Sequence, residues 1–400
     1  MRRVVGVPLL LVLTAIGCGG ANEPPAAPLA PPPVPQTTLT AEPAPAPPPQ
    51  PTPEEQKKAA DLAALEKDRA ELRAEQASEL ARFTPELREK ARSLADTAYP
   101  NARTALRAAI ASPHRKPGNA ERDKYRHPLE TLEFFGFRLN QTVLEYGPGE
   151  GWYTELLAPS LAKQGKLLIT MTDPAGPPDQ RATFYAERTK SFLDRSPELY
   201  GKVERLIIDP KAPSLPQENS VDLVLLFRGL HGMYNQNTLD TWLTEIHDAL
   251  KPNGVLGVEQ HRAAPGKTPD ETSKQGYLPE AWVIEKLQSA GFKLAGKSEI
   301  NANPKDTREH PEGVWTLPPT LKLGDKDRDK YLAIGESDRM TLKFVKVPKR
   351  AVPAAAPAAP PAATGKVQAT PSTSATPSTS ATPAAPAVAP GAAPAQPPAR

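Results

Sequence analysis

Cysteine is nearly absent from this chain, because Cys18 is the only one among 400 residues. A single thiol excludes a disulfide framework and a metal site built from thiolates. An excess of charge of one sign is also missing: the formal net charge is +3, and acidic and basic residues are interspersed. The composition therefore argues against nucleic acid as a partner.

The apolar run from Val4 to Ile16 is too short to cross a bilayer, which takes about 20 residues. It follows two arginines, as in a secretory signal. It ends at Cys18 in Ala-Ile-Gly-Cys, which resembles a bacterial lipoprotein box, although Ala15 replaces the usual leucine. We expect residues 1–18 to be a lipoprotein signal and Cys18 to carry a lipid that anchors an exported protein to the membrane on the periplasmic side. An incidental cysteine is the alternative.

Residues that form a core are scarce at both ends of the chain. Residues 19–53 are rich in proline and alanine, and residues 349–400 in proline, alanine, serine and threonine. Such segments are expected to be a tether and a disordered tail. Residues 54–83 are dense in Ala, Glu, Lys, Arg and Leu, and predict a charged helix, with a coiled coil as the alternative. The folded domain is expected over residues 84–348.

The most informative stretch is a short apolar strand, ending at Glu145, that runs into Gly147, Gly149 and Gly151 and then a helix. Glycines at these positions let the backbone approach a ligand closely and adopt positive φ. A helix N-terminus after the loop suits a nucleotide-type ligand. The carboxylate of Glu145 repels phosphate but attracts an ammonium or sulfonium cation.

This Glu-x-Gly-x-Gly-x-Gly pattern differs from the dinucleotide fingerprint and from the phosphate loop. It resembles the first motif of class I S-adenosylmethionine-dependent methyltransferases. A second run, Leu250-Lys251-Pro252-Asn253-Gly254, is similar to the family's late motif, with Asn253 in place of a glycine. Asparagine tolerates left-handed φ, so this departure is mild. The resemblance implies a Rossmann-like, mostly parallel sheet of seven strands and S-adenosylmethionine as cofactor.

Further runs resemble a group of uncharacterised bacterial predicted methyltransferases that are often exported. The similarity covers about Arg82 to Val347 and implies no known acceptor. The runs that carry it are Tyr125–Leu132, Gly151–Glu155, Phe227-Arg228, Glu259–Ala263 and Ile300–Asp306.

Strands and helices alternate after the glycine loop, which predicts an α/β fold with right-handed crossovers. The expected later strands are residues 165–173, 203–209, 221–227, 255–259, 292–295 and 340–347. The second ends at Asp173, about 20 residues after the loop, where an acid binds ribose hydroxyls. The third ends at Asp209, which is expected to reach the adenine amino group. Both acids precede proline, so turn formation is the alternative role.

Candidate catalytic residues follow the fourth and fifth strands, where the active sites of such folds lie. His231 occupies the place where the family often carries a histidine, and is expected to act as base. His261 and Glu259 are the other candidates, and a structural role is the alternative for each histidine. The absence of an Asn/Asp-Pro-Pro-Tyr/Phe motif disfavours a nucleobase or glutamine as acceptor. No histidine spacing supports a metal site.

Two segments are candidates for covering the site. Residues 122–128, which include Tyr125, are expected to close over the cofactor, with a surface loop and ion pair as the alternative. Residues 301–338 form a long connection, expected to be a lid or a surface excursion.

Three functions remain open from the sequence. The first is methyl transfer to a small or envelope-derived acceptor, the second is binding of an adenosyl ligand without turnover, and the third is a structural envelope lipoprotein.

Overall fold

The computed structural model describes residues 51–348. The predicted signal, Cys18 and both proline-rich segments, up to residue 50 and from residue 349, lie outside the described residues. The chain divides into two compact units, Met1–Lys67 and Asp68–Arg400, with the boundary inside helix α1 (Pro53–Arg82). No helix within residues 51–348 has both the length and the apolar character needed to cross a membrane.

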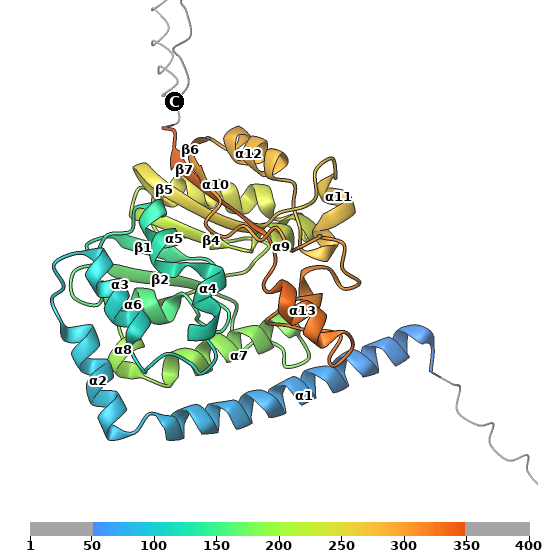
Figure 1. The fold of residues 1–400 in the computed structure, drawn as a ribbon, viewed down its shortest axis with the longest axis horizontal. Coiled ribbons are helices and arrows are strands. Elements are labelled where there is room, and N and C mark those ends of the chain that lie inside the picture. Colours follow the sequence, from blue (N-terminus) through green and yellow to red (C-terminus); the bar gives the residue numbers. More distant parts are fainter. Residues whose placement is uncertain (1–50, 349–400) are drawn as a thin grey trace, which may run out of the picture. The chain divides into compact units, whose positions relative to one another are not determined.

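The second unit is built on a seven-stranded sheet (Figure 1). Its order is β3-β2-β1-β4-β5-β7-β6, and neighbours from β3 to β5 are parallel while β7 runs antiparallel to β5 and β6. The predicted α/β class, with a Rossmann-like, mostly parallel sheet of seven strands, is confirmed. The strands are β1 (Thr142–Glu145), β2 (Lys166–Met171), β3 (Glu204–Ile207), β4 (Val221–Phe227), β5 (Leu250–His261), β6 (Phe292–Ser298) and β7 (Arg339–Lys346).

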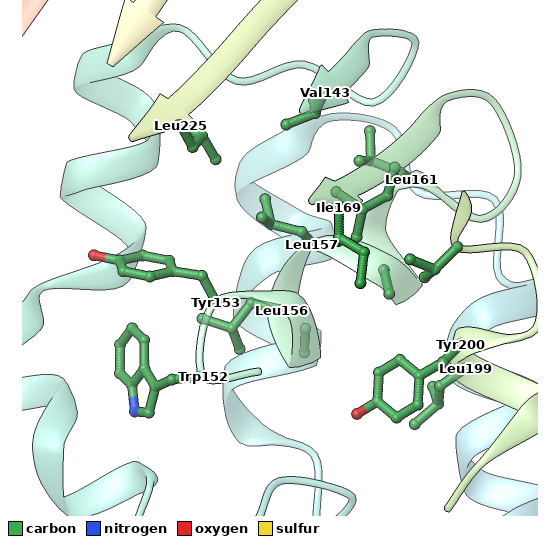
Figure 2. Packing of buried hydrophobic residues seen from close by; sticks show 14 of the residues in the cluster. Val143, Trp152, Tyr153, Leu156, Leu157, Leu161, Ile169, Leu199, Tyr200 and Leu225 are labelled. Carbon is green, nitrogen blue, oxygen red and sulfur yellow. The ribbon is translucent and has the colours of Figure 1, made fainter. Parts of the chain in front are cut away.

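The two faces of the sheet carry separate hydrophobic cores, because successive strand residues point to opposite sides. Val143 and Leu225 lie in one core, and Leu144 and Val224 in the other. Figure 2 shows part of the first core, where Leu157 lies between the strands and Tyr153. Burial on both faces explains why these strands read as continuous apolar runs.

Helices of the first core are α2 (Pro85–Asp96), α3 (Ala102–Ala111), α5 (Pro128–Phe135), α6 (Thr154–Leu161), α7 (Arg181–Asp194) and α8 (Pro197–Tyr200). Helices of the second core are α9 (Leu230–Asn235), α10 (Leu239–Ala249) and α12 (Glu280–Ser289). Shorter helical segments are η1 (Ala120–Arg122), α4 (Asp123–Arg126), α11 (Pro269–Thr272), η2 (Ser273–Gln275), η3 (Gly313–Thr316) and α13 (Arg328–Ile334).

Local signals place several of these helices. Thr84 caps α2 by accepting a hydrogen bond from Leu87 N, and Pro85 and Pro128 occupy the first turns of α2 and α5. In α1, Arg69 Nε lies 3.0 Å from Glu187 Oε2, so an ion pair joins this residue to α7.

The start of β5 differs from the expectation. The strand was predicted to begin at Val255, but it begins at Leu250, which pairs with Val221. The next paired position is Val255 with Leu223, so residues 251–254 form a bulge inside the strand. Asn253 has a φ of 61°, the left-handed conformation expected when asparagine replaces glycine.

Candidate functional site

A cleft of about 500 Å³ opens at the carboxyl ends of β1, β2 and β3. These ends lie beside the point where the strand order reverses between β1 and β4, the usual ligand site of open α/β sheets. Trp242 and Ile208 supply apolar lining, and Thr172 and Thr189 supply hydroxyl groups. The volume and the mixed lining are those of a small-molecule site.

The glycine loop divides into two functional parts. Gly147 and Gly149 line the cleft with φ of 50° and 61°, and a Cβ added to either would meet no atom within 4 Å. A Cβ at Gly151 would instead lie 2.2 Å from the Phe192 ring. The first two glycines therefore leave space for a ligand, while Gly151 makes room for a core side chain.

Hydroxyl groups hold this loop against its neighbours. Gly147 N donates to Thr170 Oγ1 at 3.0 Å, and Thr189 Oγ1 donates to Gly149 O at 2.9 Å. The loop is thus tied to both β2 and α7, which gives the cleft a preformed wall.

Glu145 lies behind the loop and does not line the cleft. It is 3% exposed, and its Oε2 accepts a hydrogen bond from Thr154 Oγ1 at 2.7 Å. Burial raises the pKa of Glu145 to about 7, against the Thr154 hydrogen bond and the charge of Arg228. The carboxyl is therefore poised to ionise near neutral pH if a cation approaches.

Asp173 and Asp209 are exposed, just outside the cleft, and each closes its own turn. Asp173 Oδ1 accepts from Ala175 N at 2.8 Å, and Asp209 Oδ1 accepts from Lys211 N at 2.9 Å. The turn role weighed from sequence is thus present in both. The second carboxylate oxygen of each makes no hydrogen bond within residues 51–348, so a ligand role stays a prediction.

Tyr125 lies away from the cleft. Its ring is next to Gly335, where an added Cβ would be 2.5 Å from Tyr125 Cε1, and its carbonyl oxygen accepts from Arg339 Nη2 at 2.5 Å. The segment around Tyr125 therefore packs against residues 335–339, at the far end of the long connection. Its cofactor role stays a prediction.

His231 and His261 lie together, with ring centroids 6.0 Å apart. The Trp315 ring is 6.0 Å from His231. Burial lowers the pKa of His231, with the Gln260 hydrogen bond acting against this and the charge of Arg228 adding to it. Burial, His231 and Arg228 lower the pKa of His261 well below its ordinary value. Both rings are therefore neutral near pH 7.

The tautomer of His231 follows from its neighbours. Gln260 Nε2 donates to Gly276 O at 2.8 Å and lies 3.3 Å from His231 Nδ1. Since Gly276 O can only accept, the amide orientation is set, and Nδ1 must accept while Nε2 carries the proton. In this arrangement the outward nitrogen of His231 is a hydrogen-bond donor.

Glu259 is completely buried at the end of β5. Tyr153 Oη donates to its Oε2 at 3.0 Å, and Oε1 lies 3.1 Å from Arg339 Nη1, without hydrogen-bond geometry. The carboxylate is thus held by an ion pair inside the protein. Its catalytic role stays a prediction.

The long connection covers this side of the sheet with η3, α13 and a set of buried polar residues. Tyr277 Oη donates to Asp306 Oδ2 at 3.1 Å, and His261 Nδ1 lies 2.5 Å from Ser337 Oγ. Asn301 Nδ2 donates to Thr131 Oγ1 at 3.0 Å. Residues 301–338 are therefore anchored to the end of β5, to α5 and to the segment around Tyr277.

No group of three His, Cys, Asp or Glu side chains placed to hold a metal ion occurs in the described part of the chain.

Several residues of this region escaped the sequence reasoning. The threonines that line the cleft carry no distinguishing signal. Glu336 and Arg339 read as an ordinary charged run before a strand, and their burial depends on contacts with residues about 210 positions earlier, Arg126 among them.

No family model matches the sequence, and no curated protein matches it. Among solved structures, the chain is similar to a SAM-dependent methyltransferase from Aquifex aeolicus at 16% identity, over 61% of this chain and 98% of that one, with a TM-score of 0.39. It is similar to the N-methyltransferase NodS from Bradyrhizobium japonicum at 15% identity, over 58% and 99%, with a TM-score of 0.35.

A third similar structure is the [4+2]-cyclase SpnF, at 16% identity over 56% of this chain and 82% of that one, with a TM-score of 0.40. Methyltransferases are thus among the solved structures that this chain resembles. The fold class stands on the strand order and strand directions of the sheet itself.

Proposed function

We propose that this protein binds S-adenosylmethionine in the cleft beside Gly147 and Gly149 and transfers its methyl group to a small acceptor. One observation carries the proposal: at both glycines an added Cβ would project into open space beside the switch point of the sheet. When bound, the donor supplies a methyl group on a positively charged sulfur.

The residues of the cleft fit an adenosyl group. The loop backbone at Gly147 and Gly149 offers close approach, and Ile208 and Trp242 offer an apolar surface for a base. Thr172 has a hydroxyl beside the position where a ribose is expected. The charges of Arg181 and Arg188 are balanced by Asp68 and Glu150, so the cleft does not repel a cation strongly.

Glu145 complements the positive sulfur through its charge. Its pKa of about 7 means that an approaching cation favours the ionised form. Donor binding is therefore expected to release a proton below pH 7.

On the side of the site where the acceptor is expected, two of the candidate bases are engaged by other side chains. Glu259 is engaged by Arg339 and Tyr153, and His231 carries its proton on Nε2. As a base, His231 would first have to lose its bond from Gln260. This arrangement suits an acceptor that needs no proton removed, or one held by a hydrogen bond from His231.

The same observation favours a second candidate, binding of an adenosyl ligand without turnover. The two functions share the cleft and differ only on the acceptor side.

Calorimetry of the purified full chain with S-adenosylmethionine and S-adenosylhomocysteine tests the cofactor. The matched variant is Gly149→Val, which fills the space beside the loop. Heat from wild type and none from the variant supports the site; no heat from wild type at millimolar ligand refutes it. Single-turnover transfer of a labelled methyl group then separates transferase from binding protein.

We also propose the lipid anchor at Cys18. Cys18→Ser should leave an unlipidated protein, and labelling with a fatty acid measures this. Equal labelling of the variant and of wild type refutes the anchor.

A further inference from the structure

Four arginines gather under the long connection, around two carboxylates. This arginine cluster consists of Arg122, Arg126, Arg228 and Arg339, with Glu336 and Glu259. Arg122 Nε lies 2.7 Å from Glu336 Oε1, and Arg126 Nε and Arg339 Nη1 each lie 2.9 Å from Glu336 Oε2. One carboxylate therefore serves three guanidinium groups.

The cluster has an excess of positive charge. Four guanidinium groups face two carboxylates, and the nearby rings of His231 and His261 are neutral near pH 7. Glu150 also acts on Arg122, but it is shared with Lys116 and Arg188. Glu145, on which the charge of Arg228 acts, is only partly ionised at neutral pH.

The excess positive charge destabilises the folded protein, because two of the arginines that carry it are buried. Arg126 and Arg339 are each 1% exposed, and burial of a charge without a partner is unfavourable. Burial and the charge of Arg228 lower the pKa of Arg126 to about 10, although Glu336 acts against this. The folded protein thus keeps unneutralised positive charge in its interior.

Donor groups of the cluster are left without acceptors. Arg126 Nη2, Arg339 Nε and Arg228 Nε are buried and make no hydrogen bond. The Arg228 guanidinium makes neither a hydrogen bond nor an ion pair with any residue between 51 and 348. Since buried donors in native proteins are nearly always paired, three together indicate a missing acceptor.

Arg228 is also placed by an unusual backbone. It follows β4 directly, with a φ of 57°, and its N donates to Glu259 O at 2.6 Å. A non-glycine residue with positive φ is uncommon and tends to occur at functional sites. The residue as a whole is partly exposed, whereas its Nε is buried.

The cluster adjoins both the donor cleft and the histidines. Gly229, next to Arg228, lies against the ring of Tyr146, which lines the cleft. His231 follows two residues later, beside Trp315.

We propose that Arg228, with Arg126 and Arg339, binds an oxyanion of the methyl acceptor, so that the acceptor is an acidic small molecule. This inference rests on the proposed function. Guanidinium groups bind carboxylate and phosphate oxygens through paired N–H donors, and either group would neutralise the excess charge. The aromatic rings of Trp315 and His231 lie beside the site, where they can contact the rest of the acceptor.

The test uses the purified full chain and three probes with the same ring: benzoate, phenyl phosphate and benzamide. Ligand-observed NMR, with and without S-adenosylhomocysteine, gives their affinities. We expect an acid to bind at least about tenfold more tightly than the neutral amide, since a charged hydrogen bond contributes that much or more. Benzoate against phenyl phosphate shows which oxyanion is preferred.

Variants assign the binding to the cluster. Arg228→Gln should weaken acid binding at least about tenfold, and Arg228→Lys less, because it retains the charge. Arg205→Gln is the matched control, since Arg205 lies on the edge strand β3 and pairs with Asp194 of α7, outside the cluster. Melting temperatures of the three variants show whether each is folded.

Two results would overturn the proposal: equal binding of benzoate and benzamide, or acid binding unchanged in folded Arg228→Gln. A third contrary result would show that the cluster binds the carboxylate of the methyl donor and not that of the acceptor. If Arg228→Gln weakens S-adenosylmethionine but not its decarboxylated analogue, and S-adenosylhomocysteine displaces benzoate, the cluster serves the donor. Acid binding at Arg228 without any adenosyl binding would sink the proposed function but leave the oxyanion site in place.

Discussion

Two alanine substitutions in one loop should have opposite consequences. Gly149 and Gly151 both have positive φ, 61° and 75°, so any side chain strains the backbone at either position. They differ in what the new methyl group meets. At Gly149 it enters open space in the cleft, and at Gly151 it lies 2.2 Å from two atoms of the Phe192 ring.

The magnitudes follow from these contacts. Left-handed backbone costs about 1–2 kcal/mol for a residue with a Cβ, and this applies to both variants. Overpacking of a buried ring costs about 1–3 kcal/mol more, and applies only to Gly151→Ala. At about 2–4 °C per kcal/mol for a domain of this size, Gly151→Ala should melt about 2–12 °C below Gly149→Ala.

Calorimetric unfolding and a donor titration on the same samples check both parts. Gly149→Ala should keep most of its stability and lose more affinity for S-adenosylhomocysteine, because its methyl group occupies ligand space. Gly151→Ala, titrated well below its melting temperature, should lose less. The reasoning is refuted if Gly149→Ala is the less stable variant, or if only Gly151→Ala loses donor affinity.

Three other predictions concern side chains. Glu336→Gln removes the carboxylate shared by three arginines and should cost about 3–5 kcal/mol in urea unfolding, and a loss below 1 kcal/mol would contradict the pairing. Burial alone would raise the pKa of Glu336, but Arg126, Arg339 and Arg122 hold it well below its usual range, so this contribution is present at neutral pH and is lost as the solution becomes strongly acidic. The pH dependence from Glu145 has the opposite sign, because its pKa rises from 4.5 to about 7 on folding. The free energy of unfolding of wild type should therefore fall by about 3 kcal/mol as the pH rises from 4.5 to 7. Melting curves of Glu145→Gln should lack that fall. His231→Ala should change the donor affinity measured by calorimetry less than about twofold, since the His231 ring does not line the cleft. The variant should lower the rate of single-turnover methyl transfer if the ring contacts the acceptor. A large loss of donor affinity would place His231 in the donor site instead.

Local patterns in the sequence determined most of the fold. Strands buried on both faces must be continuous apolar runs, and the run Val221–Phe227 became β4 with those bounds. Helix starts were equally local, because a cap such as Thr84 acts within its own first turn. The glycine loop was placed correctly because only a few residue types tolerate positive φ.

The start of β5 shows where local patterns fail. Pro252, Asn253 and Gly254 read as a turn, and the backbone does bulge there, but Leu250 still pairs with Val221 before the bulge. Pairing across the sheet depends on the neighbouring strand, which the turn signal does not describe.

The functional distinctions depend on tertiary contacts. The three loop glycines are equivalent in sequence, and only the position of Phe192 separates Gly151 from the other two. The arginine cluster joins Arg126 to Glu336, 210 residues away, and such a contact leaves no periodic trace in either segment. The sequence by itself determined the α/β class and the glycine loop, since both follow from local patterns along the chain. Only the tertiary structure decided which charges are paired, because burial and charge balance depend on every element packed around a group.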